Sequence, residues 1–169
     1  MSPEGPLPTS RVGWGFDAHR LNDTPPLTLG GVAVSEQRGV DATSDGDLVA
    51  HAVTDAVLGA CVLGDLGEHF PSDDPLLSDA DSMFLLRQAA TMAMAAGFTI
   101  AHLDVTVIAE KIRIAPHRSG IRNNLAAALG VPETIVSVKA TSTDGLGFIG
   151  SDDGIAAVAV VTVTPISRT

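Results

Sequence analysis

Aromatic residues are scarce in this chain of 169 residues: they make up 4% of it, and tyrosine is absent. Single-stranded nucleic acids are often held by stacking bases on aromatic side chains, so this composition disfavours that function. Lys and Arg are also few, 10 against 20 Asp and Glu, and the formal net charge of −10 disfavours binding to nucleic-acid phosphates. We therefore expect no nucleic-acid partner. Any anionic ligand must be held locally, by a metal ion, a helix N-terminus or a few cations.

Cysteine and long apolar runs are also missing. Cys61 is the only cysteine, so no disulfide can form within the chain. It lies among apolar residues and is expected to pack rather than to react, and a cytoplasmic location is consistent with it. No stretch approaches the ~20 apolar residues of a membrane helix, so we expect no membrane partner. Residues 1–10 lack the apolar core of a signal peptide and are expected to be a disordered tail before one domain at 11–165.

The chain is rich in small aliphatic residues, and 45% of it is hydrophobic. Apolar alternation and turn signals predict strands at 12–19, 100–109, 135–140 and 155–164, with a hairpin of 27–29 and 32–34 around Gly30-Gly31. Helices are predicted from Asp45 or Asp47 to 63, from Asp79 or Asp81 to 96, and from Pro116 to Gly130. This order favours an α/β (α+β) fold. We expect a two-layer domain with a mixed four-stranded sheet plus the small hairpin, and helices packed on one face.

Asp17 and His19 end the first predicted strand and are two residues apart, so their side chains point to the same face. His51 lies near the start of the first predicted helix. A carboxylate and two imidazoles that converge would provide the three protein ligands of a catalytic zinc site with one open position. Asp47 or Asp55, one helical turn away, could accept the free ring N–H of His51. An isolated Asp-x-His pair is more often solvated surface, but the His51 helix is otherwise largely apolar.

Two loops have the composition of phosphate-binding sites. Residues 139–148 are dense in hydroxyls and glycines, which suit phosphate oxygens, and Asp144 could hold a magnesium ion that bridges phosphates. Lys111, Arg113 and the helix N-terminus after Ala115 could receive an anion. Taken alone, the first pattern is more often only a turn, and the second only a solvated basic loop.

Taken together, several motifs in this order resemble the 2-C-methyl-D-erythritol 2,4-cyclodiphosphate synthase family, from Arg11 to about Val163. Each motif alone is weak, and their order makes the match specific. The motifs are residues 15–21, 44–47 with His51 and 54–56, 63–67, 70–71, 80–82, 115–117, 139–144 and 146–148.

The resemblance implies an enzyme of the non-mevalonate isoprenoid pathway, a metal-dependent phosphorus-oxygen lyase. Such an enzyme cyclises 4-diphosphocytidyl-2-C-methyl-D-erythritol 2-phosphate to 2-C-methyl-D-erythritol 2,4-cyclodiphosphate and releases CMP. The resemblance also implies a homotrimer with active sites between subunits. It further implies one Zn²⁺ per chain, Mg²⁺ or Mn²⁺ on the substrate diphosphate, and an isoprenoid diphosphate at the trimer axis.

The resemblance also assigns roles to residues. Asp17, His19 and His51 would bind zinc, and Thr43, Ser142 and Asp144 would be catalytic. The loop 109–115 would read cytosine, mostly through backbone atoms. The substrate-binding residues would be Asp17, His19, Thr43, Ser44, Asp65, Gly67, Phe70, Asp74, Ala109, Lys111, Arg113, Ala115, Thr141, Ser142, Thr143, Asp144, Phe148 and Ser151.

Three positions depart from the family pattern. Thr43 stands where the family usually has His, Ser72 where many members have Asp, and Ser151 where Arg is common. Asp152 and Asp153 follow Ser151 and would repel an anion. Two alternatives therefore stay open: a non-catalytic trimeric homologue that binds isoprenoid diphosphates, and a zinc-dependent phosphohydrolase.

Overall fold

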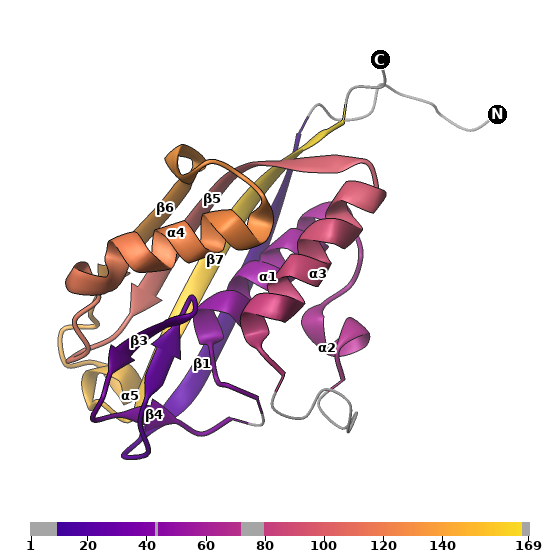
Figure 1. Cartoon of the computed structure of the whole chain (residues 1–169). Coiled ribbons are helices and arrows are strands. Elements are labelled where there is room, and N and C mark those ends of the chain that lie inside the picture. Colours follow the sequence, from indigo (N-terminus) through magenta and orange to yellow (C-terminus); the bar gives the residue numbers. More distant parts are fainter. Residues whose placement is uncertain (1–9, 43, 72–79, 167–169) are drawn as a thin grey trace.

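The structure is a computed structural model, which describes residues 10–42, 44–71 and 80–166. Its main feature is a mixed five-stranded sheet in the order β4-β1-β7-β5-β6, with a separate two-stranded hairpin, β2-β3 (Figure 1). The strands of the main sheet are β1 (Arg11–Asn22), β4 (Gly39–Val40), β5 (Phe98–Ile108), β6 (Val136–Thr141) and β7 (Gly154–Pro165). The hairpin strands are β2 (Leu27–Leu29) and β3 (Val32–Ser35).

The α/β class is confirmed, and the sheet has one strand more than the four expected. The extra strand, β4, has only two residues and pairs with the end of β1 through Leu21 and Val40. A segment that short cannot show an alternating pattern, so its pairing is decided by the neighbouring strand. β7 pairs antiparallel with both β1 and β5, whereas β5 and β6 are parallel.

Three helices cover one face of the sheet: α1 (Leu48–Cys61), α3 (Ser82–Ala95) and α4 (Arg118–Leu129) (Figure 1). Side-chain caps account for their starts: the Asp47 carboxylate accepts the Ala50 N–H at 3.0 Å, and Asp81 accepts the Met83 N–H at 2.9 Å. Gly130 ends α4 in the left-handed conformation. The short elements are α2 (Leu66–His69), η2 (Ala115–His117), η3 (Glu133–Ile135) and α5 (Gly147–Gly150).

The core lies between α1 and the sheet, and two glycines let the two layers approach closely. Eleven of the α1 residues are buried. Gly13 and Gly15 of β1 face this helix, and a Cβ atom on either would overlap the carbonyl oxygen of Ala56 or Ala52. The backbones of β1 and α1 therefore touch directly. Gly15 lies two residues before Asp17, and Ala52 directly follows His51, so this contact also influences the distance between Asp17 and His51.

We expect Gly15→Ala to lower the free energy of unfolding by about 1–3 kcal/mol, because its methyl group must push α1 away from β1. Urea denaturation measures this change. Gly59→Ala is the matched control: Gly59 is exposed on α1, nothing lies within 4 Å of an added Cβ atom, and alanine favours the helix. Equal stability of the two variants would contradict the close approach of β1 and α1.

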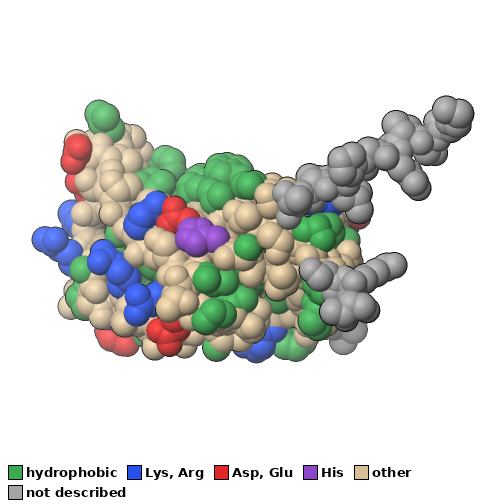
Figure 2. Space-filling view, turned by 90° about the horizontal axis from the view of Figure 1, so that it is seen from above, with side chains coloured by type: hydrophobic (Ala, Val, Ile, Leu, Met, Phe, Trp, Pro, Cys, Tyr) green, Lys and Arg blue, Asp and Glu red, His purple; other side chains and the backbone are tan. Residues whose placement is uncertain are grey.

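The other face of β1 carries large apolar side chains. Side chains alternate along a strand, so Val12, Trp14 and Phe16 point away from α1. Their exposed fractions are 66%, 63% and 46%, and the Trp14 and Phe16 rings are stacked with centroids 6.1 Å apart. Seen from above, the molecule has several separate hydrophobic patches, with Lys and Arg gathered toward one end (Figure 2). Within the described residues, no helix combines the length and apolar character needed to cross a membrane.

Candidate active site and metal centre

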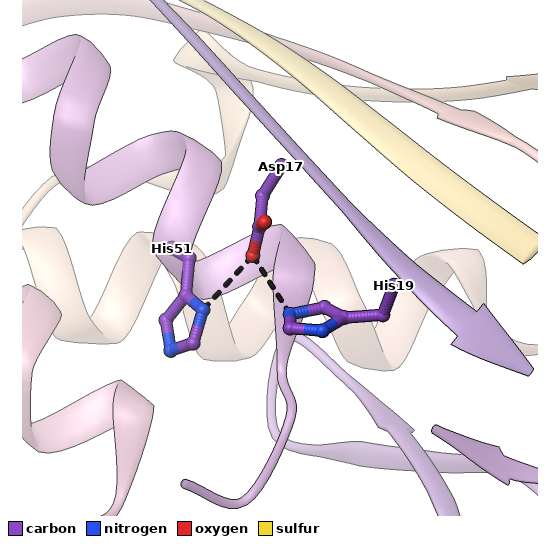
Figure 3. Close-up of side chains that lie close together, drawn as sticks. All are labelled: Asp17, His19 and His51. Carbon is purple, nitrogen blue, oxygen red and sulfur yellow. Dashed lines mark hydrogen bonds and ion pairs between the residues drawn. The ribbon is translucent and has the colours of Figure 1, made fainter. Parts of the chain in front are cut away.

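Asp17, His19 and His51 converge at the end of β1 and the start of α1 (Figure 3). The Asp17 carboxylate lies between the two imidazole rings. Its Oδ2 atom is 3.0 Å from His19 Nε2 and 2.9 Å from His51 Nδ1. The three side chains are half-buried, with 25%, 18% and 15% of their surface exposed in the order Asp17, His19, His51. A ligand can therefore reach the cluster from solvent.

The electrostatics of the cluster favour an ionised carboxylate. Burial alone would raise the pKa of Asp17, but hydrogen bonds and charge from His19 and His51 outweigh burial and hold this pKa well below its usual range. The hydrogen bond to Asp17 raises the pKa of His19 against the opposing effect of burial. The carboxylate therefore attracts positive charge, whether a proton on an imidazole or a metal ion.

The arrangement fits a tetrahedral zinc ion. Zinc bonds to imidazole and carboxylate atoms of about 2.0–2.1 Å place neighbouring ligands about 3.3 Å apart, close to the separations seen here. The Asp41 carbonyl accepts from His19 Nδ1 at 3.0 Å, so the Nε2 lone pair of His19 faces the Asp17 carboxylate. The lone pairs of His19 Nε2 and Asp17 Oδ2 are so near each other that a cation or a shared proton must lie between them. Three protein ligands also leave the open position that a catalytic site requires.

The carboxylates expected beside His51 have other partners. Asp47 is fully buried and binds its own helix and the N–H groups of Gly30 and Gly31, at 2.8 and 2.7 Å. Asp55 accepts the Leu66 N–H at 2.7 Å. The expectation that Asp47 or Asp55 orients His51 is therefore wrong. A cap position turns the Asp47 side chain back toward backbone N–H groups, and burial raises its pKa.

Sequence reasoning missed the actual neighbour of His51, which is Ser82. Its Oγ atom lies 2.8 Å from His51 Nε2, and Ser44 Oγ is more distant, at 3.5 Å. Ser82 lies inside one of the motifs, but a serine near a helix start is usually a cap, and nothing in the sequence places it beside α1.

The loop after β6 lies at the same end of the sheet as the cluster. Asp144 has a positive φ of 52°, and its carboxylate accepts the Ser142 hydroxyl at 3.1 Å. Thr143 donates to the Leu146 carbonyl at 2.7 Å, which closes the turn. Thr141, Ser142 and Asp144 are exposed. The turn thus presents hydroxyls and one carboxylate to solvent, as a phosphate and metal site requires.

The strand register gives the separation between the start of the loop, at Thr141, and the cluster. Ala18, Ala156, Ile108 and Thr141 align across β1, β7, β5 and β6. Three strand spacings separate β1 from β6, which corresponds to about 14 Å. Within one chain the start of the loop is therefore separated from the cluster, whereas its far end returns toward β1, because the Phe148 ring and the His19 carbonyl both border Gly154.

The loop 109–115 borders the same region. The Ala109 N–H donates to the Thr141 carbonyl at 3.0 Å, which joins this loop to the base of the 139–148 loop. Lys111 and Arg113 line a pocket of about 330 Å³ together with Arg38 and His117. Ala115 begins the 3-10 turn η2. Sequence reasoning had no signal for Arg38, which comes from the β3–β4 connection.

The remaining described residues that were predicted to bind substrate lie in or next to α2, in α5 and directly after α5. Asp65 caps α2 by accepting the Glu68 N–H at 2.9 Å, Gly67 lies within α2, and Phe70 follows its end. Phe148 is exposed on α5. Ser151 donates to Asp153 at 2.6 Å. Thr43, Ser72 and Asp74 lie outside the described residues.

Asp152 does not act as the free negative charge that its sequence position suggested. Its side chain is buried, and it accepts Arg38 Nη1 at 2.9 Å, with Lys111 Nζ at 3.4 Å. The expected repulsion of an anion by Asp152 is therefore wrong, because two cations neutralise it. Asp153 is exposed next to Ser151 and accepts its hydroxyl.

Fold and site together define an α/β protein with an open, solvent-accessible metal centre built from one carboxylate and two imidazoles. Residues 10–164 match the YgbB family, and the chain belongs to this family. A relative from Salinibacter ruber, named 2-C-methyl-D-erythritol 2,4-cyclodiphosphate synthase, is 48% identical over 90% of this chain and 98% of its own length. A synthase of the same name from Shewanella halifaxensis is 50% identical over 89% of this chain and 95% of its own.

Solved structures agree with these relatives. The IspF CDP complex from Plasmodium falciparum has a TM-score of 0.84 and 30% identity, covering 95% of this chain and 99% of that one. The bifunctional IspDF from Campylobacter jejuni has a TM-score of 0.90 and 38% identity over 94% of this chain. The chain spans 43% of that longer protein.

Proposed function

We propose that this chain is a cyclodiphosphate synthase, a lyase that converts 4-diphosphocytidyl-2-C-methyl-D-erythritol 2-phosphate to 2-C-methyl-D-erythritol 2,4-cyclodiphosphate and CMP in the non-mevalonate isoprenoid pathway. The observation that carries the proposal is the convergence of Asp17, His19 and His51 on one point with an open position. The named relatives and the CDP complex of a structural neighbour support the choice of substrate.

The chemistry requires positioning and charge neutralisation rather than a protein nucleophile. The substrate's own 2-phosphate attacks the phosphorus nearer the erythritol, and CMP leaves. Cys61 is buried, and burial raises the pKa of its thiol, so it is unsuited to act as a nucleophile. A zinc ion, when bound, supplies a Lewis acid for a phosphate oxygen. Asp17, His19 and His51 would hold this ion in place.

Other residues of the chain would hold the diphosphate and the base. Thr141 and Ser142 are exposed at one sheet end, with Thr143 partly buried beside them, and hydroxyls of this kind suit phosphate oxygens. Asp144, in the same turn, would hold Mg²⁺ or Mn²⁺ against the diphosphate. Backbone groups of 109–115 would read cytosine, with Lys111 and Arg113 nearby. Holding both reacting phosphates in one geometry is the main contribution of such a site to the rate.

We also propose a homotrimer whose active sites lie between subunits. Thr141, where the 139–148 loop begins, lies three strand spacings from β1, about 14 Å across the sheet, and a neighbouring subunit would supply phosphate-binding groups closer to the metal centre. The apolar face of Val12, Trp14 and Phe16 supports burial against another chain. Light scattering should give three times the chain mass, and a monomer mass at micromolar concentration would contradict the trimer. The cytoplasm is the proposed location, for which a single buried thiol is suited.

Incubation of the purified protein with the cytidylyl substrate, Mg²⁺ and Zn²⁺ tests the proposed activity. Cyclic diphosphate with equimolar CMP is the expected product pair. Linear hydrolysis products would favour the phosphohydrolase, and no turnover with both metals present would favour the non-catalytic binding homologue. Phosphorus NMR separates these three outcomes in one measurement.

We further propose that an isoprenoid diphosphate binds only weakly at the trimer axis, because Ser151 offers no cation and its hydroxyl is bound to Asp153. Ser151→Arg should strengthen binding of geranyl diphosphate on the order of tenfold, since charge-assisted hydrogen bonds are about twice as strong as neutral ones. Calorimetry measures the difference. Ser10→Arg adds the same charge just before β1, at the far end of the sheet, and should change nothing. Equal affinities of the native protein and Ser151→Arg would show that position 151 does not govern this binding.

A further inference from the structure

We infer that Asp45 and Ser82 form a hydrogen-bonded relay that fixes the orientation of the metal ligand His51. Ser82 is the first residue of α3 and is completely buried. Its hydroxyl contacts two groups: Asp45 Oδ1, through a hydrogen bond, and His51 Nε2 at 2.8 Å. The Ser82 N–H also donates to Asp45 Oδ2 at 2.9 Å. Asp45 therefore accepts hydrogen bonds from both the backbone N–H and the side-chain hydroxyl of Ser82.

Counting protons gives the direction of the relay. An ionised carboxylate can only accept hydrogen bonds, so the single proton of the Ser82 hydroxyl points to Asp45. The lone pairs of Ser82 Oγ then face His51, and His51 Nε2 must carry a proton that it donates to Ser82. The reverse assignment would leave two acceptor oxygens in close contact with no hydrogen between them, which costs free energy.

The consequence for the metal centre is that the Nδ1 atom of His51 keeps its lone pair for the metal. This atom faces Asp17 Oδ2 at 2.9 Å, within the cluster. His19 has the same arrangement, with the Asp41 carbonyl holding its outer nitrogen. Metal-binding histidines commonly donate their second N–H to an oxygen, which holds the ring in place and raises its basicity. Here a serine stands between the imidazole and the carboxylate.

The Ser82 hydroxyl is not required for starting its helix. Asp81 already caps α3 by accepting the Met83 N–H at 2.9 Å. Asp45 is largely exposed, so solvent screens its charge, and the relay acts through orientation more than through electrostatic strength. Ser82 and Asp45 are thus positioning residues, which touch neither the metal nor the substrate. The inference rests on the proposed zinc site.

Zinc affinity of the full-length protein tests the relay. Ser82→Ala should weaken zinc binding about 10- to 100-fold, measured by competition with a chelator. Thr54→Val is the matched control, because it also removes a buried hydroxyl, on α1 itself, but one that donates to the Ala50 carbonyl and not to His51. It should lower the melting temperature and leave zinc affinity unchanged. Asp45→Asn, at an exposed position, should fold normally and lose zinc affinity in the same direction as Ser82→Ala, by a smaller factor.

Cobalt(II) substitution adds a measurement that would not change if Ser82 had only a structural role. The visible absorption of bound cobalt(II) reports the ligand geometry, and it should change in Ser82→Ala but not in Thr54→Val. Native zinc affinity in Ser82→Ala and Asp45→Asn, or equal losses in Ser82→Ala and Thr54→Val, would overturn the relay while leaving the proposed zinc site intact. A native protein that binds no zinc would instead overturn the zinc site, and the role of the relay with it.

Discussion

His51→Ala is expected to lower the affinity of the protein for zinc by more than about 100-fold, so that the purified variant carries almost no metal. The reason is that it removes one of three protein ligands, whereas the loss of a group that only supports a ligand already costs about 10- to 100-fold. The two remaining ligands, Asp17 and His19, lie close together on β1 and cannot enclose a tetrahedral ion. Elemental analysis of the purified protein measures the metal content.

His102→Ala provides the control for this experiment. His102 is an exposed imidazole on β5, away from the cluster, and its removal should leave one zinc ion per chain. Full zinc occupancy in His51→Ala would remove His51 from the metal centre. Loss of zinc in both variants would instead point to a general effect on folding, which circular dichroism of the two proteins would reveal.

Asp144→Asn is expected to reduce turnover roughly 100- to 1000-fold while zinc content stays at the native level. Asp144 would hold the divalent metal ion that neutralises charge at the diphosphate, and the loss of one group that supports transition-state charge is worth about this factor. Asparagine is a clean substitution here, because Asp144 has a positive φ of 52° and asparagine tolerates this conformation as well as aspartate does. The backbone of the turn should therefore survive, and only the negative charge is lost. Steady-state turnover across a magnesium titration, with zinc analysis on the same samples, measures both quantities.

Glu133→Gln is the matched control, since it also converts a carboxylate to an amide. Glu133 lies in η3 and pairs with Arg122 at 3.7 Å, so its loss should not change turnover. If Asp144→Asn turns over as fast as the native protein at saturating magnesium, Asp144 is only a turn residue. The magnesium ion bound to the diphosphate would then need other protein ligands.

The parts of the site that lie close together in the sequence were predictable from it. Asp17 and His19 share a face because strands alternate with a period of two, and the structure keeps them on one face of β1. The apolar run after Asp47 predicted a largely buried helix with His51 near its start, and α1 is such a helix. Hydroxyl and glycine content similarly marked the 139–148 loop, which forms an exposed turn. Each prediction used local periodicity or local turn chemistry.

Contacts between distant segments had no such signal. Ser82 and His51 are 31 residues apart, and Arg38 and Asp152 are 114 apart, so only the packing of whole elements brings them together. The same holds for β4, whose two residues form a strand only because the end of β1 offers a pairing edge. Asp47 shows most clearly where local sequence patterns fail to predict a contact. It lies one helical turn from His51 and was expected beside the imidazole, yet it binds the β2–β3 turn.

Composition and local pattern alone thus dictated the α/β class and the side of β1 that carries the ligands. They also dictated the excess of acidic over basic residues. Folding in three dimensions decided which oxygen orients His51, which cations neutralise Asp152 and how closely β1 approaches α1. The physical reason is that propensity and periodicity act over a few residues, whereas a hydrogen bond between remote side chains depends on the packing that brings its two elements together. The metal ligands were therefore visible in the sequence, and their supports were not.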